Sequence, residues 1–246
     1  MTRFARLLLF AASLLVLGTP VRAQEPVDLL LVLASDVSRS VDTRKFQLQR
    51  EGYAAALSNP KVIDAIRSGP HGRIAICFVE WSGVTSQKLV IDWTIVSDAA
   101  SARKIGDQLI ELPRAFADRT SISAGIEFSM SQLERAPFRG VRRTIDVSGD
   151  GTNNSGRDVT LARDEALAKG VTINGLVILS DSPLPWNPEH TNPPGGLDAY
   201  YRNNVIGGAG AFVMVAENHN SFGQAIVKKM IAEIAFNPPP RGVILR

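Results

Sequence analysis

The chain has 246 residues, of which 45% are hydrophobic and 21% are charged, so it is long enough to form one large core. Its formal net charge of +3 comes from three arginines near the N-terminus, and without them 24 basic residues balance 24 acidic ones. Because no Lys/Arg-rich cluster or aromatic stacking motif appears either, the composition argues against nucleic-acid binding.

Residues 1–23 have the features of a signal peptide. Two arginines precede an apolar run over residues 7–17, and a junction of small residues that a signal peptidase reads ends at Ala23. We expect cleavage after Ala23, one domain over residues 24–246, and a secreted or periplasmic protein without a stable membrane span. The alternative is a retained membrane anchor, although the apolar run is short for a bilayer.

Strand and helix patterns alternate along the rest of the chain. Continuous apolar runs predict buried strands, and helical spacing of apolar residues predicts helices. The runs over 73–81 and 87–95 are separated by a polar turn and predict a hairpin. In chain order, we expect a strand over 28–35, a helix over 42–58, this hairpin, helices over 97–111 and 121–135, a strand over 142–148, a helix over 157–169, a strand over 171–179, a short helix over 196–204, a strand over 211–215 and a helix over 221–236.

This order of elements favours an α/β fold with a doubly wound, Rossmann-type sheet. The sheet is expected to be mostly parallel, with one antiparallel edge strand and helices on both faces. The helix over 42–58 is expected to stop at Asn59 and Pro60. Residues 180–196 contain five prolines and form a connection too long to be a plain linker, so we interpret them as a functional or covering loop.

A D-x-S-x-S pattern follows the first predicted strand. Asp36, Ser38 and Ser40 come directly after the apolar run 29–33, at the carboxyl end of a strand, where open α/β sheets bind ligands. One carboxylate and two hydroxyls are hard oxygen donors, which suit Mg²⁺, Mn²⁺ or Ca²⁺ better than Zn²⁺. The alternative is that these side chains only cap the next helix.

Two further segments strengthen the metal interpretation. Thr120 precedes a helical pattern, and Asp150 follows another apolar strand within the sequence SGDGTNN. With the D-x-S-x-S pattern, they resemble the metal-ion-dependent adhesion site of the von Willebrand factor type A domain. The first loop of that site matches Asp36, Ser38 and Ser40, the second matches Thr120, and the third matches Asp150. SGDGTNN departs from the commoner T-D-G but keeps the Asp-Gly pair.

The resemblance implies a role for each of these residues. Ser38 and Ser40 would contact the ion directly, Thr120 directly or through water, and Asp36 and Asp150 largely through water. Such a site leaves the ion free to accept an acidic group from a partner. The segment DVSGDGTNN, with FVEWSG upstream, is also similar to sequences of a bacterial family of secreted A-type domains of uncharacterised function.

These features predict a secreted, non-enzymatic A-type module that binds a protein or another acidic ligand through Mg²⁺, Mn²⁺ or Ca²⁺. One alternative is a metal-dependent hydrolase, although no nucleophile with an adjacent base and no phosphate-binding loop can be recognised. A second is a structural module in which the ion only stiffens the loops. The sequence does not identify the partner.

Three further residues are candidates for ligand contact. Glu80 and Trp81 end a strand parallel to the first, so they are expected on the metal-bearing face. Either residue could shape the surface that binds the ligand. In the alternative, Trp81 lies at the rim and Glu80 forms a salt bridge, without contact to a ligand. Trp186 lies in the loop 181–196, which is expected to overhang the metal. It is either a recognition residue or part of a lid.

The remaining chemistry-bearing residues are interpreted as structural. Cys77 lies within an apolar strand and is expected to be a buried thiol. Asp146 interrupts a buried strand and needs a partner, either Arg142 or Arg143 or the backbone N–H groups of the helix layer. The three histidines, His71, His190 and His219, lack the spacing of zinc ligands and are expected to be exposed in turns.

Overall fold

The structure is a computed structural model that describes residues 24–180, 185 and 187–235. Within this part of the chain, six strands form one sheet in the order β3-β2-β1-β4-β5-β6. All neighbouring strands are parallel except β2 and β3, so β3 is an antiparallel edge strand. The strands are β1 (Glu25–Asp36), β2 (Ile74–Trp81), β3 (Gln87–Val96), β4 (Phe138–Gly149), β5 (Thr172–Ile178) and β6 (Val213–Ala216).

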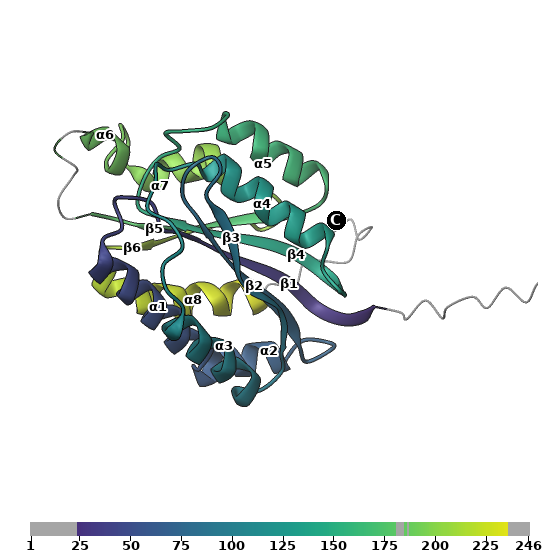
Figure 1. Cartoon of the computed structure of the whole chain (residues 1–246). Helices are drawn as coiled ribbons and strands as arrows, with labels where there is room; N and C mark the ends of the chain where they lie inside the picture. The colour runs from purple at the N-terminus through teal and green to yellow at the C-terminus, as the bar shows by residue number, and fades with distance from the viewer. Residues whose placement is uncertain (1–23, 181–184, 186, 236–246) are drawn as a thin grey trace, which may run out of the picture.

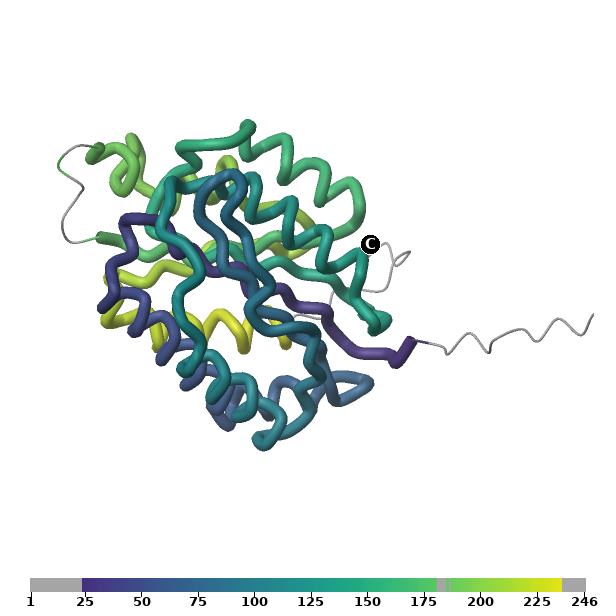
Figure 2. The backbone as a smooth tube through the Cα atoms, in the orientation of Figure 1, coloured from purple at the N-terminus to yellow at the C-terminus, as the bar shows by residue number. Residues whose placement is uncertain are grey.

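Helices cover both faces of this sheet (Figure 1), and the tube view shows the same three layers (Figure 2). The predicted doubly wound α/β architecture is therefore confirmed. One face carries α1 (Thr43–Leu57), α2 (Pro60–Arg67), α3 (Ala99–Glu111) and α8 (Phe222–Ala235), the last preceded by a 3₁₀ turn at His219–Ser221. The other carries α4 (Ile122–Glu134), α5 (Val159–Ala168) and α7 (Leu197–Tyr200), the last continued by a π-helical turn at Tyr201–Val205.

The core lies on both sides of β1, because successive side chains of a strand point to opposite faces. Leu31 and Leu33 pack with α1, α2, α3 and α8, whereas Val32 and Ala34 pack with α4 and α5. Cys77 on β2 is a buried free thiol, as expected, and burial raises its pKa. Among the described residues, no helix is long and apolar enough to cross a membrane.

Two short helices were not predicted. Pro60, which was expected only to end a helix, occupies the first turn of α2, and the Asn59 side chain caps that helix by accepting from Lys61 N at 2.9 Å. Proline is well suited to this position because the first helical N–H groups need no partner within the helix. The other helix, α6 (Pro188–Thr191), lies inside the segment predicted as a loop.

Asp146 is paired with a residue that the sequence did not indicate. Its Oδ1 lies 2.6 Å from Lys229 Nζ on α8, and Lys229 also pairs with Glu233 one turn further on. All three side chains are buried. The expected pairing with Arg142 or Arg143 is wrong, although Asp146 does face the helix layer, as the second alternative proposed. Burial raises the pKa of Asp146 to about 7, and the charge of Glu233 adds to the rise.

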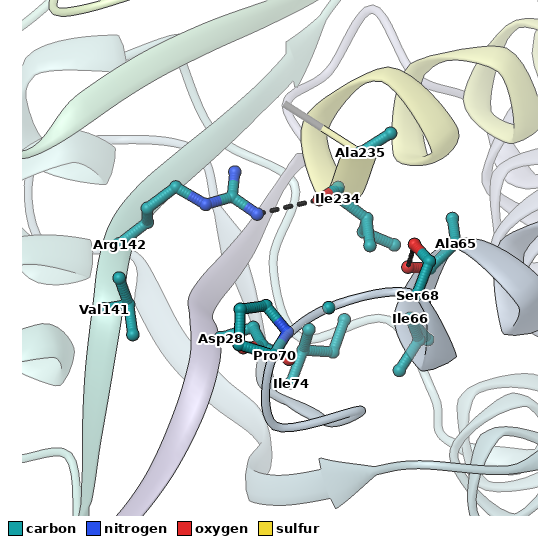
Figure 3. A pocket seen from close by; sticks show the side chains of 11 residues that line it. Asp28, Ala65, Ile66, Ser68, Pro70, Ile74, Val141, Arg142, Ile234 and Ala235 are labelled. Carbon is teal, nitrogen blue, oxygen red and sulfur yellow. Dashed lines mark hydrogen bonds between the residues drawn. The ribbon is translucent and has the colours of Figure 1, made fainter. Parts of the chain in front are cut away.

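Arg142 instead closes the C-terminal end of α8. Its guanidinium donates to the backbone oxygen of Glu233 at 2.6 Å. It also donates to the backbone oxygen of Ile234 at 2.8 Å, the bond drawn as a dashed line in Figure 3. These carbonyls have no partner within the helix, so a cation placed there is favourable. Arg142 and Asp28 line a cavity of about 60 Å³ near the amino end of β1. This cavity lies at the edge of the sheet opposite to Asp36, and we assign it a structural role.

Candidate metal centre

The loops that leave β1 and β4 meet at the carboxyl edge of the sheet. In the pairing of these parallel strands, Ser35 lies opposite Ser148, so Asp36 and the residues after Gly149 emerge side by side. Ser40 Oγ donates to Asp150 Oδ1 at 2.5 Å, and Ser38 Oγ lies 3.2 Å from Ser40 Oγ. The backbone N–H of Ser38 donates to Asp36 Oδ1 at 2.6 Å.

Thr120, the fifth predicted residue, lies just before α4 and borders the same cavity as Ser40. Its carbonyl accepts from Asn154 N at 2.9 Å, which ties the second loop to the third. Arg39 N donates to Asp118 O at 2.9 Å and ties the first loop to the second. The structure therefore gathers all five predicted metal residues at one edge of the sheet, and all five are buried.

A buried layer beneath the first loop fixes its backbone. Arg114 donates to the carbonyl oxygens of Val37 at 2.5 Å and Ser38 at 2.7 Å. Glu80 binds Ala115, the residue after Arg114: its Oε2 accepts from Ala115 N at 2.8 Å, and its Oε1 accepts from Arg50. Arg114 thus binds two successive carbonyls of the first loop.

This position changes the interpretation of Glu80 and Trp81. Both are fully buried, so neither offers a surface that a partner could touch, and we do not retain them as ligand-contact residues. Glu80 is the salt-bridged glutamate of the alternative interpretation, whereas Trp81 is a core residue packed against Gly125 rather than a rim residue. Trp186 lies outside the described residues.

The two site carboxylates carry unsatisfied oxygens. Asp36 Oδ2 and Asp150 Oδ2 are buried and accept no hydrogen bond from any described residue, although Lys45 Nζ lies 3.6 Å from Asp150 Oδ2. Burial raises the pKa of Asp36 to about 8, and repulsion from Asp150 adds to the rise. A buried carboxylate without a partner is costly. A divalent cation beside these oxygens would remove that cost, so the residues present fit the ion that the sequence predicts.

The five predicted metal residues offer carboxylate and hydroxyl oxygens, and they do not form a cluster of three or more His, Cys, Asp or Glu side chains. Within the described part of the chain, no three His, Cys, Asp or Glu side chains group closely enough to hold a metal by themselves. The two carboxylates are instead accompanied by the hydroxyls of Ser38, Ser40 and Thr120. This composition is typical of a site for a hard divalent ion.

His190 was predicted to be exposed, and this expectation is wrong. It lies on α6, is only 4% exposed, and its Nε2 lies 3.2 Å from Thr120 Oγ1. His219 is also buried, whereas His71 is exposed as expected. Burial lowers the pKa of His190, which favours the neutral imidazole. The only sequence signal for His190 was its place in the loop expected to overhang the metal.

Tyr201 is a second residue that the sequence did not reveal. Its side chain is fully buried, and its hydroxyl has no hydrogen-bond partner among the residues that the structure describes. A Cβ atom added to Gly149 would lie 2.6 Å from Tyr201 Oη and 3.2 Å from Asp36 Oδ2, so the phenol and the Asp36 carboxylate both approach Gly149. Burial raises the pKa of Tyr201, with smaller contributions from Asp36 and Asp150, so it remains a protonated phenol.

A cavity of about 390 Å³ opens above the site. Ser40, Thr120 and His190 form its inner part, and the exposed residues Arg39 and Arg119 lie on its rim. Positive side chains around a small opening attract anionic groups.

A family model described as "Protein of unknown function (DUF1194)" matches residues 26–238. The chain belongs to this family. The match spans the described domain and all five candidate metal residues of this DUF1194 member. Among curated proteins, no significant match to the sequence was found.

Solved structures place this DUF1194 chain in the von Willebrand factor type A fold. Proximal thread matrix protein 1 from the mussel byssus has a TM-score of 0.57 at 13% identity, covering 86% of this chain and 47% of that one. The pilus adhesin SpaC from Lactobacillus rhamnosus GG has a TM-score of 0.58 at 12% identity, covering 87% and 31%. A von Willebrand factor type A protein from Catenulispora acidiphila has a TM-score of 0.54 at 14% identity, covering 85% and 43%.

The chain thus spans less than half the length of these three proteins. One mussel structure is described as having a zinc-occupied MIDAS motif, the abbreviation for the metal-ion-dependent adhesion site. At such low identities the likeness establishes the fold alone.

Proposed function

We propose that the chain is a secreted, non-enzymatic A-type module that binds a protein or another acidic ligand through one divalent cation. The residues that hold Mg²⁺, Mn²⁺ or Ca²⁺ in this proposal are Asp36, Ser38, Ser40, Thr120 and Asp150. Removal of residues 1–23 as a signal peptide, and release into the periplasm or the medium of a bacterium, are part of the same proposal.

The observation that carries it is a pair of buried carboxylate oxygens, one on Asp36 and one on Asp150, to which no described residue donates a hydrogen bond. They lie at the sheet edge that also carries the hydroxyls of Ser38, Ser40 and Thr120. Burying such oxygens without a partner is costly, and a bound cation would remove that cost. Lys45 does not replace the ion, because its ammonium is directed to the Ser40 carbonyl at 2.8 Å and lies further from Asp150.

The bound cation would supply an electrophilic centre that accepts an oxygen atom from the partner. The side chains of the protein prepare this contact. Ser40 donates its proton to Asp150, which leaves lone pairs of its oxygen for the ion. Arg39 and Arg119 on the rim attract an acidic partner and favour its approach to the cavity.

A capture experiment tests the proposal. Immobilised protein is incubated with periplasmic extract in Mg²⁺ or in EDTA, with Asp36→Ala and Asp150→Ala variants beside it. We expect partners that are retained only by the wild type and only with Mg²⁺. Asp107→Ala, an exposed carboxylate on α3, is the matched control and should behave as the wild type. Capture that is unchanged in EDTA would contradict the proposal, and turnover of phosphoesters would favour a hydrolase.

A further inference from the structure

The buried ring of His190 packs against the third metal loop. His190 lies on the four-residue helix α6, next to the third metal loop, which follows β4 and contains Asp150. The backbone carbonyl of His190 accepts from Thr152 N in this loop at 2.9 Å. A Cβ atom at Gly151 would lie 2.3 Å from the imidazole, so the glycine is what lets the ring approach the backbone this closely. The ring edge that remains free of the backbone faces Thr120.

The distances match those between neighbouring ligands of one ion. Ligands at about 2.1 Å in adjacent octahedral positions lie roughly 3 Å from each other. Ser38 Oγ and Ser40 Oγ are 3.2 Å apart, and Thr120 Oγ1 and His190 Nε2 are also 3.2 Å apart. Ser40, Thr120 and His190 line the same cavity. The imidazole nitrogen therefore stands beside Thr120 in the way that the two serine oxygens stand beside each other.

The other ring nitrogen, Nδ1, contacts two side chains of the third metal loop. Nδ1 lies 3.3 Å from Thr152 Oγ1 and 3.3 Å from Asn154 Nδ2. Metal-binding histidines usually donate the N–H of one ring nitrogen to the protein and offer the other to the ion. Binding through Nε2 requires the tautomer in which Nδ1–H donates to Thr152 Oγ1 and the Asn154 amide, whose Nδ2 can only donate, turns away from the ring. This tautomer leaves the Nε2 lone pair directed to the Thr120 side of the site.

We propose that His190 is a metal ligand through Nε2, and that the site of this chain is a mixed oxygen and imidazole site. This inference rests on the proposed function, because it requires an ion at the five predicted residues. An imidazole ligand favours Zn²⁺, Ni²⁺ or Cu²⁺ over Mg²⁺, Mn²⁺ and Ca²⁺, which prefer oxygen atoms. It also makes α6, a segment of the β5–β6 connection, part of the metal centre.

Pulsed electron paramagnetic resonance of the wild-type protein loaded with Mn²⁺ tests the ligation without any variant. Imidazole bound to the ion gives a nitrogen hyperfine coupling that oxygen ligands do not give. We expect this coupling in the wild type. It should disappear in His190→Ala and His190→Gln and persist in His71→Ala, which removes an exposed histidine near the opposite edge of the sheet.

Calorimetric titration with Zn²⁺ and Mg²⁺ tests the preference. We expect Zn²⁺ to bind at least about tenfold more weakly to His190→Ala and His190→Gln than to the wild type, with a much smaller change for Mg²⁺. Thermal unfolding without metal checks that each variant folds, and the wild-type spectrum decides the question if neither does.

Each outcome separates this inference from the function on which it rests. Mn²⁺ binding without nitrogen coupling overturns the ligation and makes Nε2–H a hydrogen-bond donor to Thr120, with Asn154 donating to Nδ1. An unchanged Zn²⁺ affinity in both variants overturns it as well, while Mg²⁺ binding would leave the proposed function standing. A wild-type protein that binds none of these ions overturns both.

Discussion

Ser40 Oγ donates to Asp150 Oδ1 at 2.5 Å across a separation of 110 residues. The contact exists because β1 and β4 are adjacent and parallel, so that the loops after both strands leave the same edge. It orients the Ser40 hydroxyl, but it satisfies only one oxygen of the Asp150 carboxylate. The fold thus brings Ser40 and Asp150 together, but this contact leaves the negative charge of the Asp150 carboxylate unbalanced.

The first prediction is that Mg²⁺ or Mn²⁺ stabilises the purified chain. An ion at about 100 times its Kd should raise the free energy of unfolding by ~2.7 kcal/mol, because it binds only the folded state. For a chain of this size, that corresponds to a rise in Tm of about 5 °C or more. Differential scanning calorimetry with metal and with EDTA measures it.

Asp36→Ala and Asp150→Ala should lose this shift, and Asp107→Ala should retain it. Asp36→Asn should also raise the Tm of the metal-free protein, because it removes a buried carboxylate whose pKa is raised to about 8. Identical melting curves with metal and with EDTA for the wild type would count against the site.

The second prediction concerns the buried ion cluster of Asp146, Lys229 and Glu233, in which two carboxylates share one ammonium. Lys229→Met should destabilise the protein by about 3–5 kcal/mol, because it leaves both carboxylates buried without a cation. Asp146→Asn should be far milder, since Lys229 and Glu233 then form a neutral pair. Urea unfolding at pH 8 with Mg²⁺ present compares the two variants.

The same cluster predicts the direction of the pH dependence. The folded pKa of Asp146 is raised to about 7 from its ordinary value of 3.8, so its contribution to stability is fully present at low pH and is lost as the pH rises through 7. Asp146→Asn should reduce the loss of stability between pH 5 and pH 8. An equal loss in the variant would place the titrating group elsewhere.

Local patterns in the sequence were sufficient to predict the alternating elements and the edge of the sheet at which the five candidate metal residues meet. Apolar runs specify buried strands such as β1, and a D-x-S-x-S pattern after a strand has a fixed place at the sheet edge. Pro60 misled the prediction because proline both stops one helix and begins another. The local pattern does not distinguish these two roles.

The partners supplied from distant segments were not predictable. Lys229 reaches Asp146 from the last helix, and no periodicity within β4 indicates which helix residue lies opposite. His190 and Tyr201 both belong to the connection between β5 and β6, where no regular period fixes the direction of a side chain. Their contacts depend on how that segment folds over the sheet edge, which only the three-dimensional structure shows.

The third prediction is that Arg114 acts on the metal site through the backbone. Arg114→Met removes the hydrogen bonds to the carbonyls of Val37 and Ser38 while keeping an apolar side chain of similar length. We expect the affinity for Mn²⁺ to fall by about tenfold, since such supporting contacts commonly have this effect. Arg103→Met, on the outer surface of α3, is the control. Equal Mn²⁺ affinities in both variants would remove Arg114 from the site.

The fourth prediction is that the exported protein begins at Gln24, as the junction ending at Ala23 implies. N-terminal sequencing of protein recovered from the periplasm or medium measures this directly. A chain that still begins at Met1 and sediments with membranes would replace secretion with anchoring.

The last prediction uses the close approach of Gly149 to Tyr201 and Asp36. A methyl group at Gly149 would lie 2.6 Å from Tyr201 Oη, so Gly149→Ala must displace the phenol or the carboxylate. We expect a loss of about 1–3 kcal/mol in stability and weaker Mn²⁺ binding. Gly223→Ala is the matched control, because its added methyl would have no neighbour closer than 3.6 Å.

Tyr201→Phe shows whether the phenol hydroxyl causes this loss. Removing the hydroxyl opens the space that the new methyl needs, so the double variant Gly149→Ala with Tyr201→Phe should recover part of the stability that Gly149→Ala loses. In a double-mutant cycle, this recovery appears as an interaction energy between the two sites. Additive losses would mean that the methyl acts on Asp36 alone, and Tyr201 would then be a neighbour of the metal centre without influence on it.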